Sequence, residues 1–344
     1  MTTITVPASK QYDVIIGSGL LSSVGSQVAG ITKGTKICVV SDSNVMPLYG
    51  AAVLRSLECS GFQCCSFVIP AGEASKNGET YLALLNHLAR HHFTRSDTLM
   101  ALGGGVVGDL TGFAAATYLR GIAYVQVPTT LLAAVDSSVG GKTAIDLPAG
   151  KNLAGAFCQP SLVLCDTDTL NTLPEEIFRD GCAEVIKYGI LYDESLFRHL
   201  EHHGLDFDRE AVISRCVALK RDVVTEDEFD RGARMKLNLG HTIGHGVESC
   251  SNYTISHGSA VAIGTAIVAK ACGCADSDRI ISCLTKFGLP VGTEFHASAL
   301  ASAARSDKKR AGGTIHLILP RTIGHCDICP TPVEELESFI QAGL

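Results

Sequence analysis

Short apolar runs alternate with helical patterns along the first half of the chain. The runs are rich in β-branched residues and mostly apolar throughout, which is typical of buried strands. The predicted strands are residues 12–16, 36–40, 64–69, 97–102, 122–127 and 162–165, and the predicted helices include residues 75–91 and 106–118. Alternation of strands and helices favours a mostly parallel sheet with helices on its faces, which is an α/β fold.

The second half has a different pattern, in which segments of helical length dominate. Pro174 suits the first turn of a helix, where its missing backbone N–H costs nothing. The predicted helices are residues 174–190, 208–225, 240–250, 259–274 and 280–287, and only residues 314–319 resemble a strand. We therefore expect an α/β domain over residues 1–170 and an α-helical domain over residues 171–344, with the active site in the cleft between them.

Composition and charge narrow the class of protein. The 344 residues are 46% hydrophobic and 18% charged, so a sizeable core is available, and the net charge of −7 argues against nucleic acid or an anionic membrane as a partner. The first residues lack the basic and apolar stretches of a signal peptide, and the longest apolar run, near 260–269, is too short to cross a bilayer. We expect a cytoplasmic protein in which most of the 14 cysteines are reduced thiols.

One cysteine pair, Cys326-x-x-Cys329 beside His325, has the spacing of half a zinc site. No second pair with suitable spacing accompanies it. Ordinary packing is therefore the favoured interpretation of these residues.

A glycine-rich segment follows the predicted strand that ends at Leu102. It comprises Gly103, Gly104, Gly105, Val106, Val107, Gly108 and Asp109 and leads into a predicted helix. Glycines allow the backbone to approach a phosphate, and a helix N-terminus offers N–H groups to it. The usual acidic residue about 20 positions downstream is missing, and the candidate for holding a ribose is Asp42, upstream. Nucleotide binding and a structural turn both remain open from spacing alone.

Histidines and one carboxylate suggest a metal site. His241 and His245 are spaced to lie on one face of a helix, His257 follows before another helical segment, and Glu184 lies in a predicted helix upstream. One carboxylate with two or three histidines suits a catalytic zinc or a related divalent ion. Among twelve histidines such a pair also arises by chance, so spacing alone leaves the site open.

Several cations stand in segments otherwise rich in small residues, where a surface charge is the ordinary explanation for each. Together with a metal they would suit a substrate that carries phosphate and carboxylate groups. Lys142 is the most distinctive, because residues 136–146 have the composition of a site loop without the spacing of a Walker A loop. The set is Arg120, Lys142, Lys151, Lys187, Lys220, Arg234, Lys308 and Lys309.

At these positions the sequence resembles the 3-dehydroquinate synthase family. The matching segments are GGGVVGDLTGFAAATYLRG (103–121), PTTLLAAVDSSVGGKTAIDLPAGKNLAGAF (128–157), GCAEVIKYGI (181–190), LNLGHTIGH (237–245), HGSAVAIG (257–264) and DKK (307–309). The resemblance implies an N-terminal Rossmann-like NAD domain and a C-terminal α-helical metal-binding domain. It also implies Zn²⁺ or Co²⁺ on Glu184, His241 and His257, with His245 placed near the substrate phosphate instead.

The resemblance further implies two sets of binding residues. For NAD they are Asp42, Asn44, Glu73, Lys76, Gly105, Val106, Val107, Gly108, Asp109, Thr129, Thr130, Asp136, Lys142, Lys151, Thr169, Leu170, Asn171 and Thr172. For the substrate they are Arg120, Asp136, Lys142, Asn152, Lys187, Lys220, Arg234, Asn238, His245 and one of Lys308 and Lys309.

The reaction implied is the conversion of 3-deoxy-D-arabino-heptulosonate 7-phosphate to 3-dehydroquinate and phosphate. NAD takes a hydride from the C5 alcohol, phosphate is eliminated, the hydride returns, and ring opening and an intramolecular aldol closure follow. NAD is therefore used without net reduction. The family is commonly dimeric, so a homodimer is expected as well.

Three other functions remain as alternatives. Sister sugar phosphate cyclases close other sugar phosphates, including the amino-dehydroquinate and valiolone types, with the same cofactors. A metal-dependent polyol dehydrogenase of related fold would release NADH in net terms. A catalytically dead relative acting as a binding protein is disfavoured by the intact metal residues and lysines.

Overall fold

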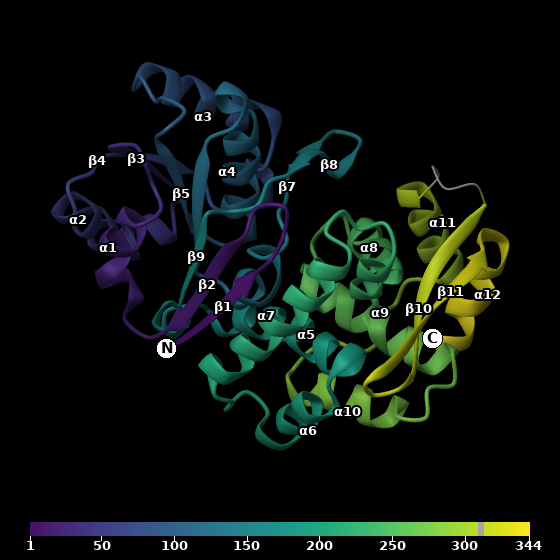
Figure 1. Ribbon diagram of the computed structural model, residues 1–344. Helices are drawn as coiled ribbons and strands as arrows, with labels where there is room; N and C mark the ends of the chain where they lie inside the picture. The colour runs from purple at the N-terminus through teal and green to yellow at the C-terminus, as the bar shows by residue number, and fades with distance from the viewer. Residues whose placement is uncertain (309–312) are drawn as a thin grey trace. The chain divides into compact units, whose positions relative to one another are not determined.

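The computed structural model describes residues 1–308 and 313–344 (Figure 1). Contacts divide the chain into two compact units, the first made of Met1–Leu173 and Arg209–Phe229 and the second of Pro174–Asp208 and Asp230–Leu344. The sequence pattern had suggested one boundary near residue 170. The returning segment is helix α7 (Arg209–Glu226), which packs on β1 (Thr2–Val6) and therefore belongs with the sheet of the first unit.

The first unit is built on a seven-stranded sheet in the order β1-β2-β9-β6-β5-β3-β4. β1 pairs with β2 antiparallel, and the other neighbouring strands pair in parallel. The sheet confirms the expected α/β fold and all six predicted strands. The remaining strands of this sheet are β2 (Tyr12–Gly17), β3 (Lys36–Asp42), β4 (Gln63–Ile69), β5 (Thr98–Gly103), β6 (Ala123–Pro128) and β9 (Leu162–Asp166).

Helices cover both faces of this sheet, which explains why its central strands are apolar almost throughout. Every residue of β5 is buried, for example. One face packs against α3 (Gly78–Arg90) and α4 (Gly105–Thr117), and the other packs against α1 (Val24–Ala29) and α2 (Ala51–Cys59). Two strands outside the main sheet, β7 (Lys142–Leu147) and β8 (Gly150–Phe157), form a hairpin that the sequence pattern did not predict.

The second unit is mainly helical, as expected. The predicted helices correspond to α5 (Glu175–Tyr192), α8 (His241–Cys250), α9 (His257–Ala271) and α10 (Ser277–Lys286). α9 is almost entirely buried and packs against α5, α8 and α12. The other elements are α6 (Glu194–His203), α11 (Ala297–Lys308), α12 (Leu336–Gly343), β10 (Thr314–Thr322) and β11 (His325–Pro332).

The strand β11 was not expected, and it accounts for the Cys326-x-x-Cys329 pair. Side chains three residues apart on a strand point to opposite faces, so the two thiols do not converge on one ion. Cys326 is buried in the unit, whereas Cys329 is only partly covered. Within the described part of the chain, neither belongs to a group of three metal-ligating side chains, which favours the packing interpretation.

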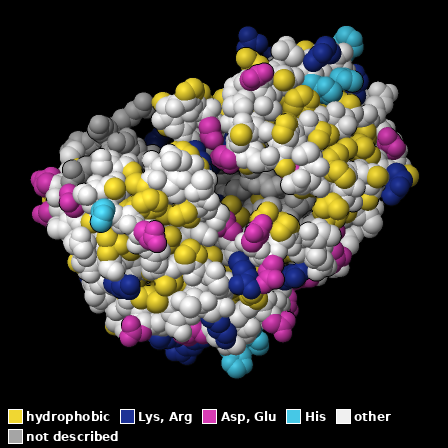
Figure 2. Space-filling model, turned by 180° about the vertical axis from the view of Figure 1, so that it is seen from behind, with side chains coloured by type: hydrophobic (Ala, Val, Ile, Leu, Met, Phe, Trp, Pro, Cys, Tyr) yellow, Lys and Arg dark blue, Asp and Glu magenta, His cyan; other side chains and the backbone are white. Residues whose placement is uncertain are grey.

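Two surface features bear on possible partners. On the face drawn in Figure 2, basic and acidic side chains are interspersed rather than separated into fields of one sign. Across residues 1–308 and 313–344, no helix has both the length and the apolar composition that a membrane span requires.

Candidate active site

Three side chains of the second unit form a compact metal-ligating group. Glu184 comes from the middle of α5, His241 from the first position of α8 and His257 from the first position of α9. Their ligand atoms lie within 4.8 Å of one another, and Glu184 Oε1 is 3.4 Å from His241 Nε2 and 3.6 Å from His257 Nε2. The side chain of Glu184 is fully buried. One carboxylate and two imidazoles at this spacing suit a divalent ion with an open position.

The protonation of His241 supports a metal at this point. Its Nδ1 lies 3.0 Å from the carbonyl oxygen of Leu239, which accepts only, so Nδ1 carries the proton. Burial, reinforced by the charge of Lys187, lowers the pKa of His241 to about 3, and the ring is therefore neutral. Its Nε2 lone pair consequently faces a carboxylate oxygen of Glu184. Two acceptors at this separation call for a cation between them.

His257 is held by a second carboxylate. Its Nδ1 lies 3.6 Å from Oε2 of Glu248, on α8. Burial by itself would lower the pKa of His257, but the nearby carboxylates of Glu184 and Glu248 outweigh it and raise that pKa to about 10. An outer carboxylate of this kind orients a metal-binding imidazole and increases its basicity. Both histidines thus have the outer partner that metal ligands normally have.

Asp180 joins the helices that carry Glu184 and His257. It lies one turn before Glu184 on α5, and its Oδ1 accepts hydrogen bonds from the hydroxyl of Ser256 and, at 2.8 Å, from the backbone N–H of Ser259. These donors belong to the N-terminus of α9, so Asp180 caps that helix. Gly258 lets the two helices meet, because a Cβ there would lie 1.9 Å from the carbonyl oxygen of Asp180.

Glycines also set the distance between α8 and α9. Gly240 precedes α8 with a φ of 77°, in the left-handed region, and a Cβ there would lie 2.3 Å from Oγ1 of Thr265. A Cβ on Gly264 would lie 2.1 Å from the carbonyl oxygen of Gly240. Because these contacts leave no room for side chains, the start of α8, and with it His241, is held close against α9.

Two more predicted residues lie beside the metal-ligating group. Lys187, one turn after Glu184, forms an ion pair with Oε2 of that carboxylate and is almost fully buried. His245 has its ring centre 5.7 Å from that of His241 and 6.2 Å from that of His257. It groups with Glu248 and His257 and not with Glu184, which agrees with a place next to the metal ligands rather than among them.

In the first unit, the glycine-rich segment forms the turn between β5 and α4. Gly104 is the N-cap of α4 in an extended conformation, and a Cβ on it would lie 3.0 Å from Thr130 Cγ2. The backbone N–H of Thr129 donates to the carbonyl oxygen of Gly103 at 3.0 Å, which places the Thr129–Thr130 pair beside this turn. The arrangement leaves backbone N–H groups at a helix N-terminus, where a phosphate binds well.

Lys76 connects several of the residues expected to bind NAD. It is buried, with Nζ 2.6 Å from Oδ2 of Asp109, 2.5 Å from Oδ1 of Asn152 and 3.8 Å from Oε1 of Glu73. Burial raises the pKa of Asp109 to about 6 although Lys76 opposes the change. Burial lowers the pKa of Lys76, but the charges of Asp109 and Glu73 outweigh it and raise that pKa overall. The structure therefore brings Lys76 together with Glu73 and Asp109, which are also expected to bind NAD, and with Asn152, which is expected to bind the substrate.

Other residues expected at the nucleotide have local structural roles. Asp42 ends β3, and its Oδ1 accepts from the backbone N–H of Asn44 at 2.8 Å and of Val45 at 3.0 Å. In the segment Thr167–Asn171, Thr169 offers its carbonyl oxygen to the hydroxyl of Tyr49 at 3.1 Å, and Leu170 is buried. Asn171 accepts from Arg209, and Thr172 contacts Tyr49.

The predicted substrate residues of the first unit include one close pair. Lys220 on α7 forms an ion pair with Asp136 Oδ1 at 2.7 Å and also donates to the carbonyl oxygen of Asp136. Lys142 is exposed at the start of β7, and Lys151 is partly covered on β8. Arg120 and Asn152 have φ values of 68° and 56°. Left-handed backbone at a non-glycine residue costs energy and is frequent at functional sites.

Of the remaining substrate residues, Arg234 is buried and Asn238 is partly buried, both in the segment Ala233–Asn238 just before α8. Lys308 or Lys309 is predicted to contact phosphate. The structure describes the backbone of Lys308 but not its side chain, and Lys309 lies outside the described residues.

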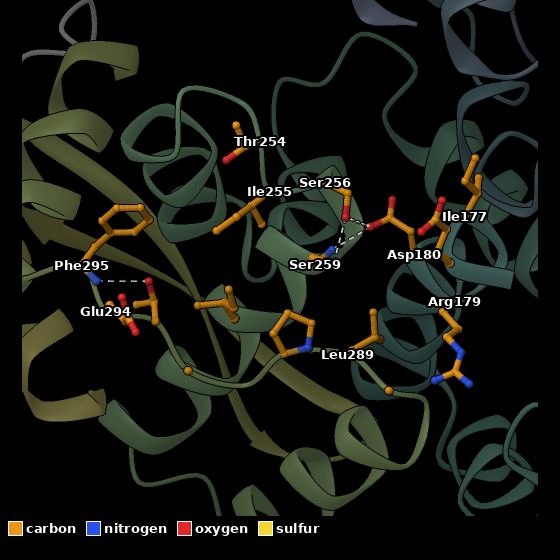
Figure 3. Close-up of a pocket in the computed structure, with 16 residues that line it drawn as sticks. Ile177, Arg179, Asp180, Thr254, Ile255, Ser256, Ser259, Leu289, Glu294 and Phe295 are labelled. Atoms are coloured by element: carbon orange, nitrogen blue, oxygen red, sulfur yellow. Dashed lines mark hydrogen bonds between the residues drawn. The ribbon is translucent and has the colours of Figure 1, made fainter. Parts of the chain in front are cut away.

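A pocket of about 790 Å³ in the second unit is separate from these residues. Figure 3 shows Asp180 and Ser256 at one side of it and Phe295 at the other. The described residues that line it include none of the predicted site residues, although Asp180 and Ser259 connect its wall to the N-terminus of α9.

Sequence reasoning missed three residues that support the metal-ligating group. Glu248 follows His241 by two helical turns, so helical spacing could have found it. Asp180 lies one turn before Glu184, but its role depends on contact with α9, which spacing within α5 does not predict. Nothing in the sequence marks Gly258, whose role is visible only from the tight packing of α9 against α5.

Comparison with known proteins gives a consistent result. Residues 66–180 match the family model for the 3-dehydroquinate synthase N-terminal domain, and residues 181–310 match the model for the C-terminal domain. A 3-dehydroquinate synthase of Enterococcus faecalis is 43% identical over 98% of this chain and 98% of its own length.

Solved structures of two related cyclases resemble the fold. A 2-deoxy-scyllo-inosose synthase complexed with carbaglucose-6-phosphate, NAD⁺ and Co²⁺ has a TM-score of 0.89 at 25% identity and covers both chains completely. A 2-epi-5-epi-valiolone synthase of Streptomyces hygroscopicus with NAD⁺ and Zn²⁺ bound has a TM-score of 0.87 at 28% identity, covering 96% of each chain. With the family models spanning most of the sequence, the chain belongs to the 3-dehydroquinate synthase family.

Proposed function

We propose that this chain converts 3-deoxy-D-arabino-heptulosonate 7-phosphate to 3-dehydroquinate and phosphate, with NAD and one divalent metal as cofactors. The observation that carries the proposal is the group formed by Glu184, His241 and His257, with the Nε2 lone pair of His241 facing the Glu184 carboxylate. Relatives named 3-dehydroquinate synthase match nearly the full length of this chain. The related cyclases of known structure are less similar to it in sequence.

Glu184, His241 and His257 would hold the metal, and Zn²⁺ or Co²⁺ fits this donor set. When bound, the metal would supply a Lewis acid for a substrate hydroxyl, and NAD would accept and return a hydride. Lys187 forms an ion pair with Oε2 of Glu184, and the other oxygen, Oε1, faces the two imidazoles. Lys187 thereby fixes the carboxylate and adds a positive charge next to the metal ligands.

In the first unit, the turn at Gly104 and the N-terminus of α4 would bind the pyrophosphate of NAD through backbone N–H groups. Lys76, fixed by Asp109 and Asn152, would add a positive charge to this nucleotide site. The other NAD residues expected from the family complete the proposed site.

The substrate carries a carboxylate and a phosphate, which require cations or hydrogen-bond donors. The proposed donors are Arg120, Lys142, Asn152 and Lys220 in the first unit and Lys187, Arg234, Asn238 and His245 in the second. Asp136 would position Lys220 through their ion pair. Arginine forms bidentate contacts with such groups, whereas lysine acts as a point charge.

Substrate choice tests this proposal against the sister cyclases. Phosphate release should be measured with 3-deoxy-D-arabino-heptulosonate 7-phosphate, sedoheptulose 7-phosphate and glucose 6-phosphate, with NAD and Zn²⁺ or Co²⁺ present. The proposal expects release from the first compound alone, lost on chelation. Release from either of the others, but not from the first, would assign the chain to a different cyclase reaction.

The family resemblance also leads us to propose a homodimer in the cytoplasm. Light scattering of the purified protein at several concentrations tests the oligomeric state, and a single monomeric mass would reject the dimer.

A further inference from the structure

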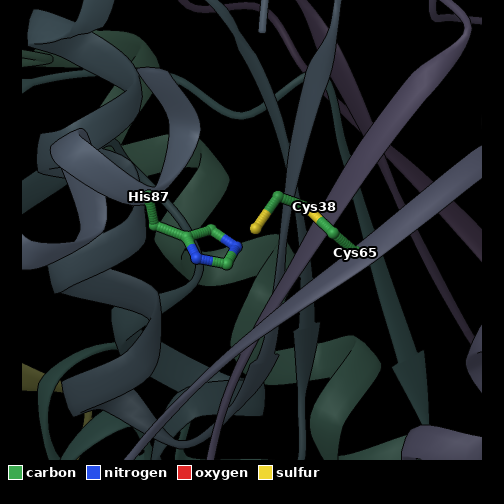
Figure 4. A group of neighbouring side chains, drawn as sticks. All are labelled: Cys38, Cys65 and His87. Atoms are coloured by element: carbon green, nitrogen blue, oxygen red, sulfur yellow. The ribbon is translucent and has the colours of Figure 1, made fainter. Parts of the chain in front are cut away.

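A second group of metal-ligating side chains lies in the first unit, apart from the residues of the proposed active site. Cys38 on β3 and Cys65 on β4 are partners in the parallel register of these strands, so both side chains point to the same face of the sheet. His87 on α3 covers that face. Figure 4 shows its imidazole with one ring nitrogen directed toward the two cysteines. The two sulfurs and one ring nitrogen lie within 4.8 Å of one another.

This spacing is close to what a tetrahedral ion needs. With Zn–S bonds of about 2.3 Å, two sulfurs on a tetrahedral zinc lie about 3.8 Å apart, and a sulfur and a nitrogen lie slightly closer. The separations in the protein, at most 4.8 Å, therefore require side-chain movements of about 1 Å or less. Small rotations about the side-chain bonds of Cys65 and His87 supply such movements, because neither residue is fully buried.

The imidazole of His87 is also in the state that a metal ligand needs. Burial, with the charges of His91 and Arg90, lowers the pKa of His87, so its ring is neutral at neutral pH. Nε2 of His87 is buried and makes no hydrogen bond to any of the described residues. The proximity of the two thiols, which the strand register brings to one face of the sheet, raises the pKa of Cys38 and lowers that of Cys65, so Cys65 is the thiol that loses its proton first.

Charge decides which ion fits best. Cys38 lies in an apolar cluster with Val40, Leu84 and Leu88, where an uncompensated charge would be costly. Two thiolates and a neutral imidazole neutralise a divalent ion completely, whereas a monovalent ion would leave one negative charge. A sulfur-rich site prefers soft or borderline ions to Mg²⁺ or Ca²⁺.

We propose that Cys38, Cys65 and His87 form a second metal site, distinct from the one on Glu184, which takes Zn²⁺ or another divalent thiophilic ion. Binding forms two metal–sulfur bonds and one metal–nitrogen bond and releases the two thiol protons to water, without oxidation or reduction. A water molecule would supply the fourth ligand, because Cys65 and His87 are only partly buried.

The site would join three elements whose ends carry residues proposed for NAD binding. β3 ends at Asp42, and the segment between β4 and α3 contains Glu73 and Lys76. An ion that links β3, β4 and α3 would therefore stabilise this edge of the sheet. β4 is the last strand of the sheet and has a neighbour on one side only, so it gains most from such a link.

Cobalt distinguishes this site from the one on Glu184, because only a site with cysteine ligands gives a thiolate-to-cobalt charge-transfer absorption in the near ultraviolet. The reduced, metal-free full-length protein should be titrated with Co²⁺. The proposal expects this absorption in the wild type, its loss in Cys65→Ser, and its retention in Cys64→Ser. Cys64 is the matched control, since it precedes Cys65 on β4 and packs on the opposite face of the sheet. Cys65→Ser should retain basal turnover.

A measurement on the unaltered protein keeps the test independent of how the variants fold. Alkylation of Cys65 with iodoacetamide, followed by mass spectrometry, should slow at least tenfold when Zn²⁺ is added, while Cys64 in the same sample keeps its rate. Absence of the cobalt–thiolate absorption, its survival in Cys65→Ser, or equal alkylation of Cys65 with and without Zn²⁺ would each reject the site.

Discussion

Gly258 offers a direct test of how the metal-ligating group is built. It is the second residue of α9 and follows His257. In Gly258→Ala, the new Cβ would lie 1.9 Å from the carbonyl oxygen of Asp180 and 2.8 Å from its Cγ, whereas Cβ atoms essentially never come within 3.0 Å of such atoms. The start of α9 must therefore move away from α5 by about 1.1 Å.

This displacement separates His257 from Glu184, because the two residues lie on the helices that are forced apart. Overpacking of this kind costs about 1–3 kcal/mol of stability. Metal affinity should fall about 10- to 100-fold, as it does when the support of a ligand is removed. Turnover should fall about 100-fold, the loss expected when reacting groups are misplaced by about 1 Å.

Zinc affinity measured by competition with a chelator in a Cys65→Ser background, which removes the proposed cysteine site, together with unfolding of the metal-free protein, checks this prediction. Gly292→Ala is the matched control, because it lies in the same unit and a Cβ there meets no atom within 4 Å. The reasoning is refuted if Gly258→Ala binds zinc as tightly as Gly292→Ala while remaining folded.

Two further predictions concern charge. In Cys65→Ser, where the proposed cysteine site is removed, zinc binding near neutral pH should release about one proton, because His257, with its pKa raised to about 10, is protonated in the metal-free protein, whereas His241, with its pKa lowered to about 3, is not. Affinity should therefore rise about tenfold per pH unit below pH 10; calorimetry in buffers of different ionisation enthalpy measures the release, and Glu248→Gln should reduce it. Asp109→Asn removes the closest negative charge from the buried Lys76 and should lower the free energy of unfolding by about 3 kcal/mol and weaken NAD binding. Denaturant unfolding and NAD titration measure both, and unchanged stability would contradict this account of the pair.

The sequence predicted the α/β and helical halves well, because the strands of a doubly covered sheet are apolar throughout and the helices are long. It did not predict the hairpin of β7 and β8. Most residues of β8 are exposed or only partly buried, and glycine, alanine and asparagine give no clear strand signal. The return of α7 to the first unit was also missed, because helical periodicity does not specify which core a helix packs against.

The candidate metal ligands show the same limit. Spacing on α8 grouped His241 with His245, because both lie on one face of a helix. The choice between them depends on where α5 and α9 place Glu184 and His257, and only the resemblance to a family supplied that information. Asp180 and Glu248 act across helices and could be recognised only once α5, α8 and α9 were seen together.

The central claim is that the metal held by Glu184, His241 and His257 supports a reaction that uses NAD without consuming it. One experiment tests it most directly: phosphate, 3-dehydroquinate and NADH are followed together after 3-deoxy-D-arabino-heptulosonate 7-phosphate is added to the protein with NAD and Zn²⁺. We predict equal amounts of phosphate and 3-dehydroquinate, no accumulated NADH, and loss of all turnover in Glu184→Gln. Net formation of NADH, or normal turnover in Glu184→Gln, would contradict the account.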